Sequence, residues 1–294
     1  MTKGYHVGLC ALVLSSAACA GEMGVISPTA SQGFYAGIGG GYHSANINDQ
    51  LIYGKGVNSA YSNIGNILTS TGSAAGYSNP FYQTNTLFSP NVQAGYLQHF
   101  GANDHFWGAK FVYDYLNAHF SNNNTNIAQA GSNYNVITGA TTPFTGNYVV
   151  ESVQTSINHE FLLLAYLGHS FKNSNLYFGI GPSLFGMDSN IYNLVGFADY
   201  KGMPGTDISG AAVSLSQSMW EWGGAAQLGL TYSLSPTWFL DFNYTYAGTG
   251  KNTIKYVSPF TNQIATDHLV GTSYINPSQW AAVQSVRVTI NKSF

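Results

Sequence analysis

Six charged residues lie in segments of the chain that otherwise alternate between apolar and polar side chains. They are Lys110, Asp114, Glu160, Glu221, Asp241 and Arg287. Side chains of these types can form ion pairs, transfer protons or line a path for ions. Because side chains alternate along a strand with a period of two, all six can point to the same side of one sheet. In the interior of a narrow barrel they must pair, since an isolated buried charge carries a large desolvation cost.

Two uses of this expected ion-pair network stay open, structural pairing that fills the lumen and a narrow, gated path for ions. Arg287 and Lys110 are the only cations on the expected inner face. The guanidinium of arginine can bind two carboxylates at once. We therefore expect Arg287 to be the hub of an interior salt-bridge network that includes Asp241 or Glu221.

Other patterns that carry chemistry are weak. His159 and Glu160 are neighbours in sequence, so in a strand they point to opposite faces and cannot act as a pair. The sequence contains no G-x-S-x-G motif and no histidine or cysteine spacing typical of a metal site. The glycines of 37–41 are not followed by a phosphate-binding lysine. We expect no enzyme activity, no cofactor and no metal.

The last segment of the sequence alternates between apolar and polar residues. Val286, Val288, Ile290 and the terminal Phe294 share one face, and Arg287, Thr289, Asn291 and Ser293 share the other. Lys292 interrupts the apolar face. Period-two segments of this kind are strands with one apolar side. The sequence predicts eight of them, at 33–45, 90–100, 106–115, 150–171, 176–185, 218–234, 238–246 and 280–294.

Long and short connections alternate between these eight segments. Polar, aperiodic stretches predict four long loops, at 46–87, 116–147, 186–215 and 247–279, and short turns lie at 101–105, 172–175 and 235–237. Scattered apolar residues at 53–68 and 133–148 leave open that strands extend above the membrane in these two segments. Trp107 and Trp238 lie near the turns, whereas Trp220 and Trp280 lie near the loops. Two aromatic girdles are typical of a transmembrane barrel. We therefore predict an all-β fold, an eight-stranded antiparallel transmembrane β-barrel with four long extracellular loops and both chain ends in the periplasm.

Composition agrees with this fold and excludes others. Only 7% of the residues are charged, against about 25% in an ordinary soluble domain. With 9 Lys+Arg against 12 Asp+Glu there is no basic stripe for nucleic acid. No apolar run approaches the roughly 20 residues of a spanning helix. A soluble lipocalin-like barrel is the alternative, and it would place its charges outside.

The first 32 residues differ from the rest. Lys3, an apolar run and Ala18-Cys19-Ala20 predict a signal peptide at 1–20, whose removal takes both cysteines with it. Lipoprotein processing at Cys19 is the alternative, but Ser16 stands where leucine is usual. Residues 21–32 are the expected periplasmic N-terminal arm, and 33–294 the barrel.

With its GFYAGIGGGY opening and VRVTINKSF ending, the chain resembles the small OmpA-like, porin-like outer-membrane barrel family. The resemblance implies a place in the outer membrane of a Gram-negative bacterium, contact with lipid and lipopolysaccharide, and insertion by the barrel-assembly machinery. It also implies an interior acid–base cluster. Members act as structural proteins or minor porins, or as adhesins that bind host or surface ligands through their loops, and both kinds of role stay open.

The resemblance makes Phe294 the end of an assembly signal that also contains Ile290, Val288 and Val286. Deletion of Phe294 is expected to leave secretion intact and to lower the amount of folded barrel in the outer membrane. Heat-modifiability on gels measures that amount. A normal level of folded barrel in the deletion variant would contradict this role of the carboxyl-terminal strand.

Overall fold

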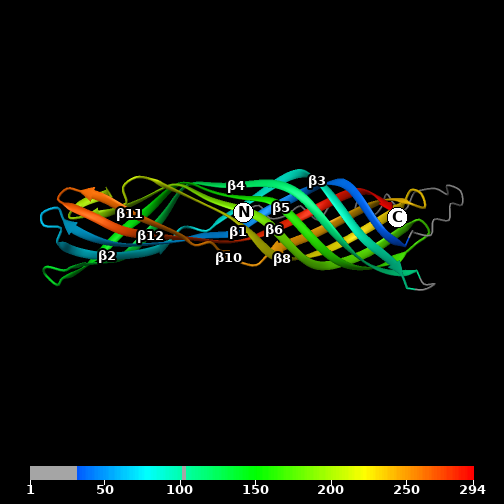
Figure 1. Cartoon of the computed structure of the whole chain (residues 1–294), viewed down its shortest axis with the longest axis horizontal. Coiled ribbons are helices and arrows are strands. Elements are labelled where there is room, and N and C mark those ends of the chain that lie inside the picture. The colour runs from blue at the N-terminus through cyan, green and yellow to red at the C-terminus, as the bar shows by residue number, and fades with distance from the viewer. Residues whose placement is uncertain (1–31, 101–103) are drawn as a thin grey trace, which may run out of the picture.

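Long antiparallel strands make up most of the chain in the computed structural model, which describes residues 32–100 and 104–294 (Figure 1). The predicted signal peptide at 1–20 and nearly all of the predicted arm at 21–32 lie outside the described residues. The strands are β1 Gly33–Ser62, β2 Leu68–Tyr77, β3 Phe81–His99, β4 His105–Asn135, β5 Thr141–Ser170, β6 Ser174–Tyr200, β7 Met203–Asp207, β8 Val213–Ser233, β9 Trp238–Thr249, β10 Asn252–Thr253, β11 Tyr256–Ile264 and β12 Asp267–Ser293.

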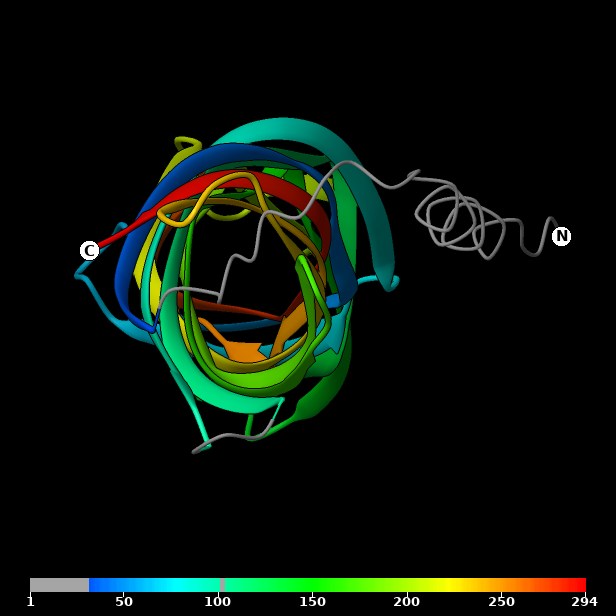
Figure 2. The same cartoon turned by 90° about the vertical axis from the view of Figure 1, so that its right-hand side faces the viewer.

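Eight of these strands close into a ring. β1 pairs with β3 on one side and with β12 on the other, and the ring continues through β4, β5, β6, β8 and β9 back to β12. Figure 2 shows the strands wound around a common axis. The remaining strands extend the ring at the end away from the chain termini, which we call its upper end. There β2 lies in line with β3, β7 with β8, and β10 and β11 with β9. The predicted eight-stranded antiparallel architecture is confirmed.

The four predicted long loops are not loops. β4 has 31 residues and β1 has 30, whereas a tilted strand needs about 9–11 residues to cross a membrane. At about 3.3 Å a residue and a tilt near 40°, the remaining 20 or so residues carry the sheet about 50 Å further. The residues at 46–87, 116–147, 186–215 and 247–279 are mostly strand, and only short tips such as 63–67 and 136–140 connect them.

β-Bulges and residues with positive φ explain why the period-two alternation does not reveal these extensions. The pairing register shifts at Asp49, Asn117 and Asn193, and these residues have φ values of 49°, 53° and 52°. Asp and Asn tolerate this left-handed conformation better than most residues. At Asp49 and Asn193 the buried positions change from odd to even numbers, so the period-two pattern breaks although the strand continues. On β4 the even-numbered positions stay buried past Asn117, and the change comes at Asn124, which has a φ of 54°.

The outer wall carries an apolar belt near the chain ends. Large apolar side chains exposed there include Phe111, Leu163, Ile180, Leu228, Phe242 and Val288. Charged residues on the same strands, among them Lys110, Asp114, Glu160 and Arg287, are instead buried inside. A soluble barrel would show the reverse arrangement. An apolar outside around a polar interior is the arrangement of a membrane-spanning barrel. No helix in the described part of the chain is long and apolar enough to cross a membrane.

Side chains fill the interior in layers along the axis. Tyr35, Tyr166 and Tyr177 belong to an aromatic cluster near the turns. Beyond the charged layer follow two apolar clusters, one with Leu162 and Phe185 and a more distal one with Ile127 and Ile275. Glycines make room for the large rings. A Cβ at Gly229, for example, would lie 2.1 Å from the Tyr177 ring.

The position of the belt can be tested on β5. Arginine at Leu163, which faces outward in the belt, is expected to lower the free energy of unfolding by about 2–4 kcal/mol because a charge near the midplane is costly. The control is Gln154→Arg, exposed on the same strand above the belt, where the cost is about 0–1 kcal/mol. Reversible urea unfolding in lipid vesicles measures both. Equal costs at the two positions would contradict this placement of the membrane.

Candidate functional site

Arg287 lies at the centre of the charged layer and is 1% exposed. β12 carries it inward, opposite Gly41 on β1 and Asn243 on β9. Its Nε atom donates to Asp114 Oδ1 at 3.0 Å, and its Nη2 atom lies 2.9 Å from Asp114 Oδ2 and 2.6 Å from Glu160 Oε2. Arg287 thus holds two fully buried carboxylates, which come from β4 and β5, the strands across the lumen.

Among the described residues, neither Asp241 nor Glu221 is a direct partner of Arg287. Asp241 pairs with Lys110, at 3.0 Å from its Nζ atom. Glu221 is only partly buried and accepts a hydrogen bond from Asn252. Glu221 lies opposite Phe185 on β6, in the part of β8 that continues beyond the last residue paired with β9, where Asn252 is its partner.

The Lys110–Asp241 pair belongs to a wider polar layer. Tyr177 accepts a hydrogen bond from Lys110 at 2.7 Å and donates one to Asp241 at 2.7 Å. Gln93 donates to Asp241 Oδ2, Thr289 Oγ1 and Asn291 Oδ1 at 2.7–3.1 Å. These neutral partners were missed from the sequence because tyrosine and glutamine on an inward face carry no charge that marks them. The layer spans the lumen from β3 to β12.

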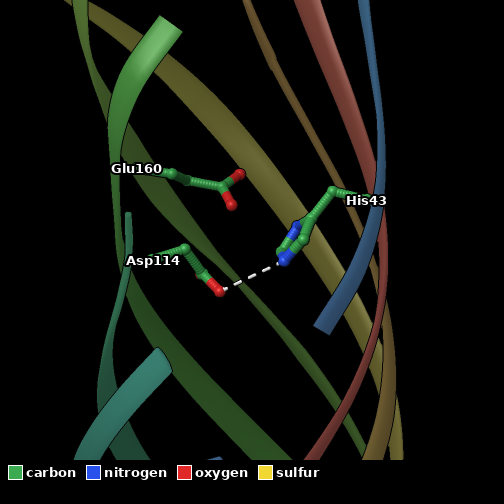
Figure 3. Close-up of side chains that lie close together, drawn as sticks. All are labelled: His43, Asp114 and Glu160. Atoms are coloured by element: carbon green, nitrogen blue, oxygen red, sulfur yellow. Dashed lines mark ion pairs between the residues drawn. The ribbon is translucent and has the colours of Figure 1, made fainter. Parts of the chain in front are cut away.

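His43, on β1, completes the charged layer (Figure 3). Its Nε2 atom lies 3.6 Å from Asp114 Oδ1, and its two ring nitrogens contact Ser285 and Ser89 at 2.8 and 2.9 Å. One ligand atom each from His43, Asp114 and Glu160 lie within 4.8 Å of one another, a grouping that could hold a metal ion. Arg287 already donates to both carboxylates, however, and its charge would repel a divalent cation. The arrangement therefore suits an ion-pair cluster better than a metal centre.

The outward residues predicted for the membrane boundary and the assembly signal lie on the outer wall. Trp107, Trp220 and Trp238 are exposed, and Trp280 is partly exposed. Val286, Val288, Ile290 and Phe294 are exposed on the outer face of β12 and at its end. Lys292, which interrupts that face, places its Nζ atom 5.8 Å from the ring centre of Trp238 and 5.7 Å from that of Phe294. A lysine ammonium near two aromatic rings is compatible with a position at the membrane boundary.

A second charged contact lies at the distal end of the barrel, outside the belt. Asp267 accepts hydrogen bonds from Lys201 and Tyr200 and so joins the β6–β7 tip to the β11–β12 tip. Burial tends to raise the pKa of Asp267, but these hydrogen bonds outweigh it and lower the pKa below its ordinary value. Burial, followed by the contact with Asp267, raises the pKa of Tyr200.

The outer wall above the belt holds a shallow depression of about 490 Å³. In it, His119 Nδ1 lies 2.8 Å from Ser156 Oγ, the contact on which serine nucleophiles depend. A third group would have to orient the histidine. The carboxylate in the depression, Asp188, instead accepts hydrogen bonds from Asn158, at 2.6 Å, and Ser218. The depression is thus a hydrogen-bonded surface rather than a catalytic triad.

A closed antiparallel ring with an apolar belt, an inward polar layer and aromatic residues at the belt's edges defines a transmembrane β-barrel protein. No protein-family model matches the chain, and no curated protein matches it. Among solved structures, it is similar to the outer membrane protein OprG from Pseudomonas aeruginosa, at 11% identity over 90% of this chain and 96% of that one, with a TM-score of 0.34. It is also similar to Ail, the attachment invasion locus protein of Yersinia pestis, at 10% identity over 85% and 99%, with a TM-score of 0.27. The outer membrane protease OmpT from Escherichia coli matches at 8% identity over 93% and 99%, with a TM-score of 0.30.

The role of Arg287 can be tested by substitution. Arg287→Ala leaves Asp114 and Glu160 without their cation, which is expected to cost about 3–5 kcal/mol of unfolding free energy. Adding Asp114→Asn and Glu160→Gln is expected to restore much of it, because no uncompensated charge then remains. The outward cation of the same strand is the control, and Lys292→Ala is expected to cost about 0.5–1 kcal/mol. A loss in Arg287→Ala no larger than in this control, measured by urea unfolding, would contradict the role.

Proposed function

We propose that this protein is a non-conducting, non-enzymatic anchor in the outer membrane that holds a rigid β-sheet extension outside the cell for contact with other surfaces. The observation that carries the proposal is the length of the strands. An anchor alone needs strands of about 9–11 residues, yet β4 and β5 have 31 and 30. Their upper two thirds contribute nothing to spanning the membrane, so we assign them to the extracellular role.

The filled interior supports this role over that of a narrow porin. Arg287, Asp114 and Glu160 cross the lumen in the charged layer, and their exposure is at most 1%. The distal apolar cluster with Ile127, Ile275 and Tyr148 fills the extension above them. An ion would have to pass an apolar layer as well as break the ion pairs. Such a path carries a desolvation cost that an open channel does not.

The surface of the extension supports contact with a partner. Its short tips expose aliphatic side chains, with Ile64 84% and Ile137 70% exposed. The tips of β1–β2 and β4–β5 lie side by side, because Val136 N donates to Thr69 O at 2.9 Å. Exposed apolar residues at the end of a rigid support are a common property of binding surfaces. Outer-membrane lipid, lipopolysaccharide and the assembly machinery are the further partners that we propose for the barrel itself.

Two measurements on the refolded protein test the proposal together. In planar bilayers the wild-type protein is expected to give no stable conductance steps, because the interior is filled. In a whole-cell adhesion assay, replacing the tips 63–67 and 136–140 by two-residue turns is expected to reduce adhesion while the folded barrel remains heat-modifiable. Stable conductance would contradict the closed anchor. Unchanged adhesion after both tip replacements would contradict a contact role for the tips.

A further inference from the structure

One stretch of strand in the extension has a partner on one side only. β8 pairs with β6 along nearly its whole length, but its pairing with β9 begins only at Gly223, opposite Thr249. Between Val213 and Trp222, no second strand pairs with β8 in the described parts of the chain. Every second backbone N–H and C=O of this stretch therefore faces outward from the sheet edge without a ladder partner.

Other edges of the extension are protected against further pairing. β11, which pairs with β12 alone, contains Pro259, and the five-residue β7 contains Pro204. β10 has two residues and lies between Lys251 and Lys255. Proline, lysine and short length are the means by which natural sheets prevent edge-to-edge association.

The seam between β3 and the upper part of β4 is closed in another way. There, Ser121 N donates to Gln83 Oε1 and Asn85 Nδ2 donates to His119 O, both at 2.9 Å. Side chains of one strand thus satisfy backbone groups of the other. At the β8 edge, by contrast, Asn252 bonds to the side chain of Glu221 and leaves the backbone uncovered.

The β8 edge has none of these protections. Its residues Val213 to Trp220 read VSLSQSMW, without proline or charge. Serines at 214, 216 and 218 point outward, and Leu215 and Met219 point inward, where they pack against the distal apolar cluster. Trp220 and Trp222 are exposed at the level of the membrane boundary, so the stretch from Val213 to Met219 lies above it and is accessible from outside the cell.

We propose that the free edge of β8 from Val213 to Met219 binds an extended polypeptide segment of a partner as an added strand. The repeat of backbone donors and acceptors along this edge matches another strand and no other kind of ligand. Small outward serines leave room beside the added strand, and the inward apolar residues favour a segment that alternates apolar and polar side chains. This assignment rests on the proposed contact role and names the chemical class of the partner.

Hydrogen exchange on the full-length protein in lipid nanodiscs tests the edge. In the protein alone, every second amide from Val213 to Met219 is expected to exchange at least about tenfold faster than amides of β8 from Ala225 to Leu230, which pair on both sides. The probe is a capped eight-residue peptide that alternates threonine and valine. At saturation it is expected to slow the fast amides about tenfold or more, whereas the same peptide with alternate amides N-methylated is expected to leave them unchanged.

A matched pair of variants locates the binding. Gln217→Lys places an inward charge on the edge, a device that blocks strand addition, and is expected to abolish the protection. Gln154→Lys, on the doubly paired β5, is expected to keep it. Protection by the methylated peptide, or none by the plain peptide, would overturn the proposal. If the protein gives no conductance and the peptide does not protect the edge, this inference is wrong and the closed anchor stands. If the protein conducts and the peptide protects the edge, the closed anchor is wrong and this inference stands.

Discussion

The hydrocarbon of a membrane offers no partner for backbone hydrogen bonds, and this constraint determines the lower half of the molecule. Each strand there must pair on both sides, so the sheet has to close on itself. Closure is made by β1, which pairs with β3 and β12 at the two ends of the ring. With eight strands the enclosed space is just wide enough for side chains. Everything inside is therefore packed, and the polar residues must find their partners among one another.

The charges inside meet most of that requirement by pairing across the lumen. Asp114, Glu160 and Asp241 face two permanent cations, Arg287 and Lys110, and His43 lies beside Asp114. Arg287 can serve two carboxylates because its donors form a planar fork, which a lysine could not offer. Lys110 needs Tyr177 as a second partner and has it. The ion pairs come from strands on opposite sides of the ring, and so they hold the wall together across the lumen as well as around it.

Much of this fold follows from the sequence, because the membrane enforces the period of two that makes strands recognisable. The inward charges were found for the same reason: a charge on an otherwise apolar strand can only point inside. Glu221 was misplaced because position along the axis depends on register and tilt, which alternation does not reveal. His43, Tyr177 and Gln93 were missed as members of the polar layer because their types are equally common on surfaces. The extensions were predicted as loops, with strand considered only at 53–68 and 133–148, because the inward face changes at Asp49, Asn124 and Asn193 and the period of two is lost there.

Above the membrane the constraint is lifted, and the structure changes accordingly. Water can satisfy an unpaired backbone group, so the ladder no longer has to be continuous, and backbone pairing ends between β3 and β4, where side chains bridge the seam, and between β8 and β9. The extension keeps its shape because apolar side chains such as Ile127 and Ile275 fill it, as the core of a soluble protein would. The charged layer thus lies where the outside is lipid, whereas an apolar cluster fills the interior where the outside is water. The same strands run from the lipid-covered part into the water-covered part. The edge of β8 becomes free just above the boundary between these two parts.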